Sequence, residues 1–393
     1  MTITPATISR SMTERFVTGE NADTAVAAEA SRRGAQRVFL MAGNTLNRET
    51  DEINRIAAKL GAAHAATFSA IGAHAPVNDI VDAINAARDA KADLIVTVGG
   101  GAITDSGKIV ALGLKAGTRS VADVEALWKQ YTWGAGEAAA ETAPDVKVVC
   151  VPTTLSGGEL NHVAGATHGE LGKIGFEHLA NAPATIIYDP LLTRHTPEWL
   201  WLSTGVRSID HAVEALASTQ SNEYCDAIAD TALRLLADGL LRSKANPLDF
   251  EGRLRCQIGA WQSMVPILNG VPMGAGHSIG HGLGSYAHVP HGHTSCVLLP
   301  VVQKWNAEVV PERLARVSAA LGDAARPAHE LLDELIRAIG QPRSLAEVGV
   351  ENDEAVFAKI AEYAMTHPWG RTNPRKIDGP AEVMEILRLA AEQ

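Results

Sequence analysis

The fold is decided by the segment LIVTVGGGAITDSGK, residues 94–108. Its apolar run, Leu94–Val98, predicts a buried strand, and three glycines, Gly99–Gly101, close that strand before a helix begins. Glycine has no Cβ and a helix N-terminus attracts anions, so backbone amides in this turn can approach a phosphate. The turn fits neither standard nucleotide fingerprint, because Thr104 interrupts G-x-G-x-x-G and Ile109 replaces the hydroxyl residue of a Walker loop. A tight strand-to-helix turn without a ligand is the alternative.

A second candidate phosphate loop is PTTLSGGE, residues 152–159, which follows the apolar run Val146–Val151. The loop combines hydroxyl side chains, glycines and a carboxylate. Open α/β sheets bind ligands at the carboxyl ends of their strands, so two such loops after adjacent strands would lie at one sheet edge. Together the two loops favour a cofactor that carries phosphate.

The rest of the first half alternates short apolar runs with helical patterns. Further strands are predicted at Arg37–Met41 and Thr185–Tyr188, and a helix at Asp79–Ala90. Short, fully apolar strands that alternate with helices are typical of a parallel sheet covered on both faces. The segment Leu114–Asp145 shows little order and is expected to be an insertion or a surface loop.

Beyond about residue 190, strand-like runs become rare and long helical patterns follow, such as Asp226–Leu241 and Pro311–Leu321. The chain has 393 residues, more than one hydrophobic core comfortably supports. We therefore predict an α/β domain over residues 1–190 and an all-α domain over residues 191–393.

The composition excludes several classes of protein. The formal net charge is −11, which argues against a broad nucleic-acid surface. No run reaches the about 18 apolar residues of a membrane span, and the N-terminal residues lack the apolar core of a signal peptide. The four cysteines are scattered without a CxxC pair, so we expect buried thiols in a cytosolic protein.

Histidine is unusually frequent, with 14 residues. His277 and His281 are four residues apart and would share a helix face, and His291 lies in a Pro-His-Gly corner. A helical pattern over residues 204–216 places His211 on a polar face with Arg207. Such a face is usually solvated and a lone histidine is usually structural. Three neutral imidazoles together, however, suit zinc or ferrous iron.

Four sequence blocks resemble those of the group III, iron-containing alcohol dehydrogenases. GGGAITD resembles the GGGSxxD loop of that family, and PTTLSGGE resembles its PTTxxTGSE loop. TGVRSIDHAVEA resembles the TGxDALxHAIE helix, and GHSIGHGLGSYAHVPHG resembles the xHGxxHxLGxxxxxPHG block. The order and spacing match from about residue 35 to residue 300. The resemblance implies a dehydroquinate-synthase-like fold with an α/β nicotinamide dinucleotide domain, a helical domain and a cleft between them.

The resemblance also implies a reaction and a set of roles. The reaction is hydride transfer between a nicotinamide cofactor and an alcohol or carbonyl group. By position, the cofactor pyrophosphate would meet Gly99, Gly100, Gly101 and Asp105, and the rest of the cofactor would lie near Thr153, Thr154 and Ser156. The ligands of a divalent metal, Fe²⁺ or Zn²⁺, would be His211, His277 and His291, and His281 would be a candidate for proton relay beside the substrate.

Arg207 departs from the family pattern. The fourth metal ligand of the family is an aspartate four residues before the helix histidine, and a guanidinium cannot replace it because it has no acceptor atom. Asp210 is no obvious substitute, since it neighbours His211 and is turned by about 100° around the helix. The maleylacetate reductases of the same superfamily resemble this chain in lacking the aspartate and work without a metal. We hypothesise that Arg207 replaces the metal or binds a substrate carboxylate. An ion pair with Glu214 or Asp210 is the alternative.

The sequence therefore predicts a cytosolic NAD(P)-dependent oxidoreductase that reduces a small oxo-acid such as maleylacetate. A metal-dependent alcohol dehydrogenase is the second hypothesis. A lyase of the dehydroquinate synthase type and a binding protein without activity are the others. The run FLMAGNTL, residues 39–46, has no carboxylate to exclude NADP, yet no arginine is clearly placed to hold its extra phosphate. We prefer NAD(H). We expect an anionic small-molecule substrate, a homodimer, and no nucleic-acid or membrane partner.

Overall fold

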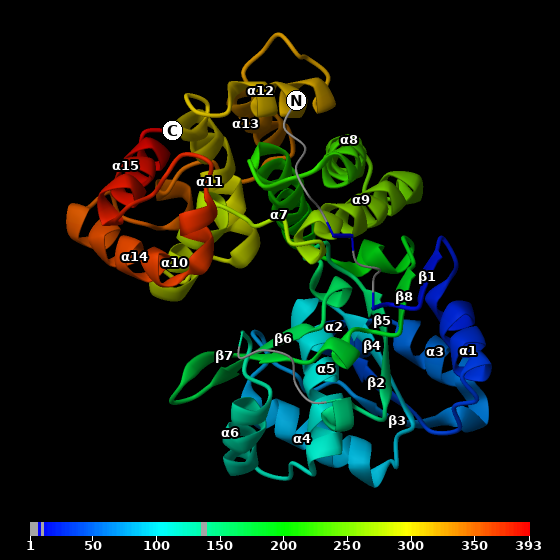
Figure 1. Cartoon of the computed structure of the whole chain (residues 1–393). Helices are drawn as coiled ribbons and strands as arrows, with labels where there is room; N and C mark the ends of the chain where they lie inside the picture. Colours follow the sequence, from blue (N-terminus) through cyan, green and yellow to red (C-terminus); the bar gives the residue numbers. More distant parts are fainter. Residues whose placement is uncertain (1–6, 9–11, 135–139) are drawn as a thin grey trace. The chain divides into compact units, whose positions relative to one another are not determined.

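The computed structural model describes residues 7–8, 12–134 and 140–393 (Figure 1). The chain divides into two compact units between His195 and Thr196. The first unit contains every strand of the described residues, and the second is built from helices. The predicted fold class, an α/β N-terminal part followed by an all-α part, is confirmed.

The α/β unit is built on a six-stranded sheet in the order β1-β8-β5-β4-β2-β3, and all of its strand pairs are parallel. The strands are β1 (Arg15–Thr18), β2 (Val38–Ala42), β3 (His64–Phe68), β4 (Leu94–Gly99), β5 (Lys147–Pro152) and β8 (Thr185–Tyr188). Strands β2, β4, β5 and β8 match the four predicted strands. A hairpin of β6 (Val163–His168) and β7 (Gly172–Glu177) forms a separate antiparallel pair.

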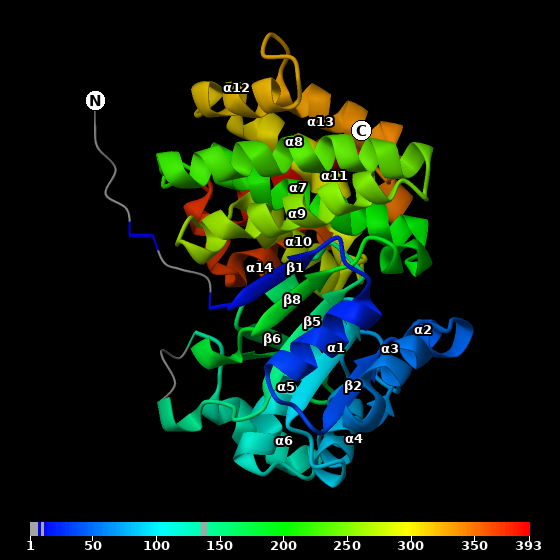
Figure 2. The same ribbon diagram turned by 90° about the vertical axis from the view of Figure 1, so that its right-hand side faces the viewer.

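Helices cover both faces of the sheet (Figures 1 and 2). The helices are α1 (Ala22–Arg32), α2 (Asn44–Glu49), α3 (Glu52–Leu60), α4 (Val77–Asp89), α5 (Gly101–Ala116) and α6 (Val121–Gln130). Helices α1 and α3 pack on the face that contains Val96 and Val98 of β4. Helix α5 packs against the same strand, and α4 packs against α5 and α6. Because both faces are covered, β2, β4 and β8 are buried at every residue, as their continuous apolar runs predicted.

The prediction of a surface loop over Leu114–Asp145 is wrong. Helix α5 continues to Ala116, and α6 follows after a capping box in which Ser120 and Asp123 pair reciprocally. Val124 and Leu127 are the buried residues of α6. Residues 135–139 of the predicted loop lie outside the described residues.

The second unit places one long helix, α7 (Glu198–Ala217), at its centre, where it contacts α8, α9, α11 and α12. Every residue of α7 from Trp201 to Ala217 is buried. The expectation that its polar face is solvated is therefore wrong, because that face packs against other helices. The remaining helices are α8 (Glu223–Ala245), α9 (Phe250–Leu268), α10 (Ala275–Tyr286), α11 (His291–Asn306), α12 (Pro311–Ala320), α13 (Ala328–Ala338), α14 (Glu354–Thr366) and α15 (Pro380–Ala391).

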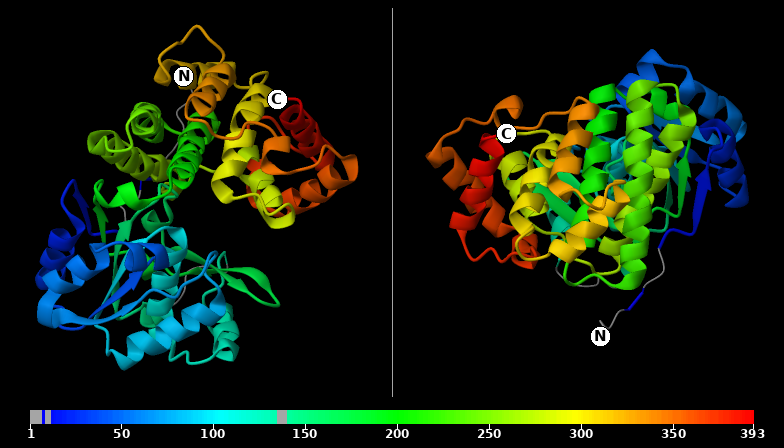
Figure 3. Two further views of the ribbon diagram at one scale, coloured as in Figure 1. Left: turned by 180° about the vertical axis from the view of Figure 1, so that it is seen from behind. Right: turned by 90° about the horizontal axis from the view of Figure 1, so that it is seen from above.

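A second hydrophobic core joins α10, α11, α14 and α15, with the red α15 beside the yellow helices in Figure 3. A short 3-10 segment, η7 (Pro368–Thr372), contacts α10 and α14. In the described part of the chain no helix is both long and apolar enough to cross a membrane. All four cysteines are free and buried, as expected.

Candidate active site

The two glycine-containing loops lie side by side in the α/β unit. Strands β4 and β5 are neighbours, with Gly99 opposite Pro152, and the amide of Thr153 donates to the carbonyl of Gly99 at 3.0 Å. A Cβ on Gly100 would lie 3.1 Å from Cγ2 of Thr154, so the close packing of the two loops leaves little room for a side chain there. The hydroxyl oxygens of Thr154 and Ser156 are 3.1 Å apart. The predicted cofactor-binding residues are thus brought together at one edge of the sheet.

This edge has the features of a dinucleotide site. Helix α5 begins at Gly101 without a side-chain cap, and the first amides that bond within the helix are those of Ile103 and Thr104. The preceding amides are therefore available to an anion, and the helix dipole favours negative charge there. The order of the strands also reverses between β2 and β4, which is where open α/β sheets bind their ligands. The residues present therefore fit the pyrophosphate of a nicotinamide dinucleotide.

Asp105 has a different environment from the one that the family resemblance implied. One carboxylate oxygen lies 3.1 Å from Nζ of Lys108, and the other accepts from the amide of Gly165 at 3.0 Å. Lys108 is completely buried and also donates to the carbonyls of Gly158 and Val163. Asp105 and Lys108 hold α5 against the second loop and β6. No sequence pattern marked this role of Lys108, which links the helix to the second loop and β6 by its contacts.

The helical unit gathers a second set of polar side chains, around α7. Rings of His211 on α7 and His277 on α10 approach with centroids 5.0 Å apart, and both residues are buried. His281 lies one turn further along α10, and His291 is exposed as the first residue of α11. The structure therefore brings two of the three implied metal ligands together inside the unit and places the third at an exposed helix start.

Arg207 lies among these rings. Its Nη1 donates to Oγ of Ser295 at 3.0 Å and lies 3.4 Å from Oδ2 of Asp210, and that Oδ2 accepts from Ser295 at 2.7 Å. Of the two partners considered from the sequence, Asp210 is the one that Arg207 contacts by hydrogen bond. Arg207 is 6% exposed, and burial lowers its pKa while Asp210 and Glu214 oppose that shift. A guanidinium nevertheless stays charged in a protein.

The buried charge of Arg207 influences the surrounding imidazoles. Burial lowers the pKa of His211 well below its usual range, and His277 and Arg207 add to that shift. Burial, Arg207 and His367 lower the pKa of His277 in the same direction. Burial raises the pKa of Asp210, and the neighbouring Glu214 raises it further. Arg207 acts in the opposite direction and lowers that pKa. At neutral pH the site therefore holds neutral imidazoles around one fixed cation.

Two site residues were missed by the sequence analysis, and both come from the segment after α14. His367 has its ring 5.2 Å from that of His281, and Trp369 contacts His277 edge-on at 5.5 Å. Burial, His281 and Arg207 lower the pKa of His367 to about 4. No motif marks either residue, because only the packing of η7 against α10 and α14 brings them to the site.

Possible ligands for a divalent metal lie close together on α7 and α10. Within the described ranges, Asp210, Glu214 and His277 form the group whose possible ligand atoms lie within 4.8 Å of one another. Several of these atoms already have partners, because Nδ1 of His277 lies 2.7 Å from Glu214, and Arg207 and Ser295 contact Oδ2 of Asp210. Nε2 of His277 and Oδ1 of Asp210 have no hydrogen-bond partner among the described residues. A metal ion in this cluster would lie beside the guanidinium of Arg207, whose Nη1 is 3.4 Å from Oδ2 of Asp210. The charge of Arg207 therefore opposes binding of a divalent metal, although the cluster offers two unpaired acceptors.

Comparisons with known proteins agree with the fold and with the sequence blocks. The models of the Fe-containing alcohol dehydrogenase family match residues 13–190 and, for its C-terminal part, 201–391. Maleylacetate reductase 2 of Cupriavidus pinatubonensis is 30% identical over 96% of this chain and 94% of its own. A dehydrogenase of Gibberella moniliformis is 30% identical over 93% of each chain. The crystal structure of maleylacetate reductase from Agrobacterium tumefaciens matches with a TM-score of 0.82 at 28% identity, over 99% of this chain and 98% of that one. The family predicted from four sequence blocks is thus confirmed: this chain belongs to the iron-containing alcohol dehydrogenase family and is an NAD(P)-dependent oxidoreductase.

Proposed function

We propose that this enzyme reduces a small oxo-acid of the maleylacetate type with NAD(H), and that it does so without a divalent metal. Membership of the family supports a nicotinamide cofactor and, for the family as a whole, an iron-type metal. The observation that carries the metal-free proposal is Arg207, a buried cation that lies beside His211 and His277. Relatives named maleylacetate reductase support the substrate class.

The α/β unit supplies the proposed cofactor site. Its residues would be Gly99, Gly100 and Gly101 with the first amides of α5 at the pyrophosphate, and Thr153, Thr154 and Ser156 near the rest of the cofactor. When bound there, a nicotinamide dinucleotide supplies the hydride. We assign Asp105 a supporting role through Lys108. We prefer NAD(H), because Arg48, the first arginine after β2, pairs with Glu49.

Arg207 supplies the proposed electrostatic stabilisation. Reduction of a carbonyl group places negative charge on its oxygen, and a preorganised cation lowers the energy of that charge in a desolvated site. Within the described residues, the hydrogen bonds to Ser295 and Asp210 use only Nη1 of Arg207. The other donors can bind the carbonyl oxygen or, as a bidentate pair, a carboxylate of the substrate. The second arrangement favours an anionic substrate.

The proposed proton relay is His281, with His367 next to it. The two rings are 5.2 Å apart, and His367 also contacts Trp369 at 4.7 Å. His367 is neutral above its lowered pKa, so it can donate a hydrogen bond without adding a second positive charge. We further propose a cytoplasmic homodimer in which residues 1–190 bind the dinucleotide and residues 191–393 carry the histidine site.

A metal-dependent alcohol dehydrogenase is the second candidate, because Asp210, Glu214 and His277 do cluster. Elemental analysis of protein purified without a chelator separates the two. We expect much less than one metal ion per chain, and oxo-acid reduction that is unchanged after dialysis against a chelator. Stoichiometric iron or zinc, with activity that is lost and restored with the metal, would contradict the proposal. Simple primary alcohols serve as the comparison substrates, and we expect the enzyme to oxidise them slowly.

A further inference from the structure

Glu214 is held by the backbone of the segment that leads into α10. Its side chain is 4% exposed, and its two oxygens accept from the amides of Gly274 and Gly276, each at 2.8 Å. A Cβ on Gly276 would lie 2.8 Å from Oε1 of Glu214, so the approach of this backbone requires glycine. The G-A-G-H sequence at residues 274–277 therefore forms a two-donor cradle for one carboxylate.

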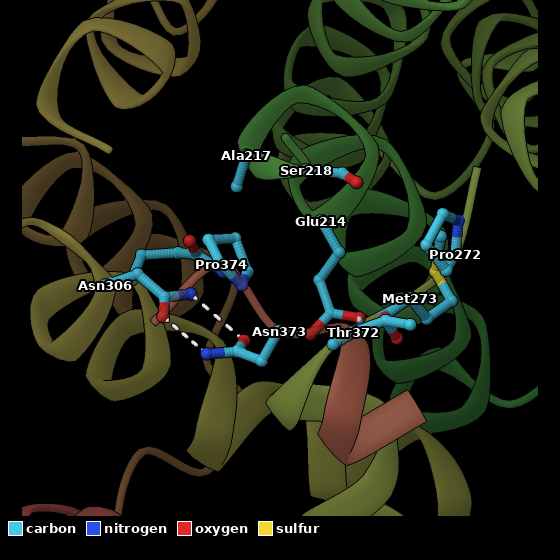
Figure 4. Close-up of a pocket in the computed structure, with 11 residues that line it drawn as sticks. Glu214, Ala217, Ser218, Pro272, Met273, Asn306, Thr372, Asn373 and Pro374 are labelled. Atoms are coloured by element: carbon cyan, nitrogen blue, oxygen red, sulfur yellow. Dashed lines mark hydrogen bonds between the residues drawn. The ribbon is translucent and has the colours of Figure 1, made fainter. Parts of the chain in front are cut away.

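The surroundings of Glu214 leave it one further partner. Figure 4 shows the carboxylate of Glu214 between α7 and Thr372–Asn373, in a pocket that Asn306 and Met273 also line. The amides of Asn306 and Asn373 pair with each other there. The remaining contact of Oε2 is Nδ1 of His277, at 2.7 Å.

This contact indicates where the proton of His277 lies. Both oxygens of Glu214 accept from backbone amides, an environment that favours the carboxylate, and a carboxylate accepts from a ring N–H, so we place the hydrogen between Oε2 and Nδ1 on the ring nitrogen. A neutral imidazole carries one such hydrogen, so its other nitrogen, Nε2, bears a lone pair. Nε2 is buried and has no hydrogen-bond partner among the residues that the structure describes. An unpaired buried acceptor of this kind indicates that a ligand completes it.

We propose that Glu214 is a positioning residue that holds His277 in the Nδ1–H form, so that Nε2 accepts a hydrogen bond from the hydroxyl group of the substrate in its alcohol form. Arg207 then donates to the same hydroxyl oxygen. His277 as acceptor and Arg207 as donor would together recognise a hydroxy-acid. This inference rests on the proposed function, because Nε2 is open to a hydroxyl only where no metal occupies it. It goes beyond that function in assigning Glu214, which acts through His277 and does not itself meet the substrate.

The first test compares single and double variants of the full chain. Glu214→Gln cannot accept from both glycine amides, so it disturbs the cradle, and we expect kcat/KM to fall about 10–100-fold, as for residues that orient a functional imidazole. His277→Asn keeps a donor near the Nδ1 position but has no counterpart of Nε2. In that background Glu214→Gln should cause no further loss of kcat. Glu29→Gln, at another buried glutamate, is the matched control and should lower stability with kcat unchanged.

The second test reads the tautomer directly and needs no substrate. In ¹⁵N-histidine-labelled enzyme, assigned with the His277→Asn variant, His277 should show a protonated Nδ1 and an unprotonated Nε2. In Glu214→Gln the proton should move partly or wholly to Nε2. A wild-type ring protonated on Nε2 overturns the inference even if Glu214→Gln does not fold, as does a Glu214→Gln enzyme with lowered stability but full kcat. If the tautomer is as expected but no oxo-acid is reduced, the proposed function fails and the role of Glu214 in orienting His277 stands.

Discussion

Each unit of the chain buries one cation on a helix beside an aspartate, and the two clusters differ in how fully they are paired. On α5, Nζ of Lys108 has acceptors in Asp105 at 3.1 Å, in the carbonyl of Gly158 at 2.8 Å and in the carbonyl of Val163. On α7, Arg207 uses Nη1 alone in its hydrogen bonds to described residues.

The neighbours of the two cations differ in the same way. Around Arg207, three buried atoms have no hydrogen-bond partner among the described residues, namely Nδ1 of His211, Nε2 of His277 and Oδ1 of Asp210. Native proteins pair almost all buried polar atoms, so unpaired ones indicate either an external partner or a cost accepted for function. We therefore interpret the Lys108 cluster as a structural brace and the Arg207 cluster as the proposed binding site.

The largest expected effect that tests this difference is the loss of folding stability when Lys108 is replaced. Replacement by Met fills the same space but leaves two carbonyls and a carboxylate without their donor. We expect Lys108→Met to lower the free energy of unfolding by about 3–5 kcal/mol, as for a broken buried ion pair. Urea denaturation measures it.

The matched control for that change lies on the same helix. Lys115 pairs with Asp145 at 3.1 Å, but the aspartate is 77% exposed. Lys115→Met should therefore change the free energy of unfolding by about 0–1 kcal/mol. Equal losses for the two variants would show that Lys108 is not a brace.

Arg207 should show the opposite division between stability and activity. Arg207→Met removes the cation that stabilises charge on the carbonyl oxygen, and loss of such a group reduces kcat by about 10²–10³-fold. The stability loss should be smaller than at Lys108, because burial already raises the pKa of Asp210 and lets that carboxyl take up a proton. Steady-state kinetics with the oxo-acid, alongside urea denaturation, measures both.

Arg253 offers a matched control in the same unit. It is buried, donates to the carbonyl of Pro247 at 2.7 Å and lies over the ring of Trp201. Arg253→Met should lower stability and leave kcat/KM unchanged. If Arg207→Met behaves like Arg253→Met, Arg207 is structural and the comparison between the clusters fails.

Much of the fold was predictable because central parallel strands are buried on both faces and give continuous apolar runs. Strands β1 and β3 were missed because they are the two edges of the sheet. Their sequences, RFVT and HAATF, alternate with polar residues and are partly exposed, so no apolar run marks them. Helix α6 buries only two residues, and its capping box was the available signal.

The site was predictable only in part. Spacing on a helix identified His211 and His277, but the same periodicity suggested a solvated face for α7. Helical periodicity distinguishes polar from apolar faces and does not say whether the polar face meets water or another helix. His367 lies 86 residues after His281 along the chain (367 − 281), so its place beside that ring depends on tertiary packing that no local pattern encodes.

Glu29 provides a smaller test, on a second paired cluster of the α/β unit. Burial opposes its ionisation, but hydrogen bonds from Arg32, Thr185 and Arg33 outweigh that and lower its pKa to about 2. An acid whose pKa is depressed in the folded state stabilises above its unfolded pKa and loses that contribution as the pH falls through the folded value. Stability should therefore decline between about pH 5 and pH 2.

The contribution of Glu29 can be separated with one variant. Glu29→Gln should lower the free energy of unfolding at pH 7 by about 1–2 kcal/mol, a modest loss because its partner Arg32 is partly exposed. The variant should also flatten the decline of stability between about pH 5 and pH 2. Chemical denaturation at several pH values measures it. An unchanged slope between the two enzymes would show that the hydrogen bonds to Glu29 do not hold it ionised.

The smallest expected effect, on kcat/KM, tests whether the orientation of the Arg207 guanidinium matters as well as its charge. Ser295 accepts from Arg207 at 3.0 Å and donates to Asp210 at 2.7 Å, so Ser295→Ala removes both bonds and leaves the charge. If the lost hydrogen bond to Ser295 costs about 1 kcal/mol of transition-state stabilisation by Arg207, kcat/KM should fall about fivefold. Ser318→Ala is the matched control, since that buried hydroxyl bonds only to the carbonyl of Leu314 within its own helix. If both variants lose the same stability and neither loses activity, the Arg207 cluster is as structural as the Lys108 cluster, whatever its unpaired atoms suggest. A fivefold loss in Ser295→Ala alone would show that the direction of the guanidinium, and not only its charge, determines the rate.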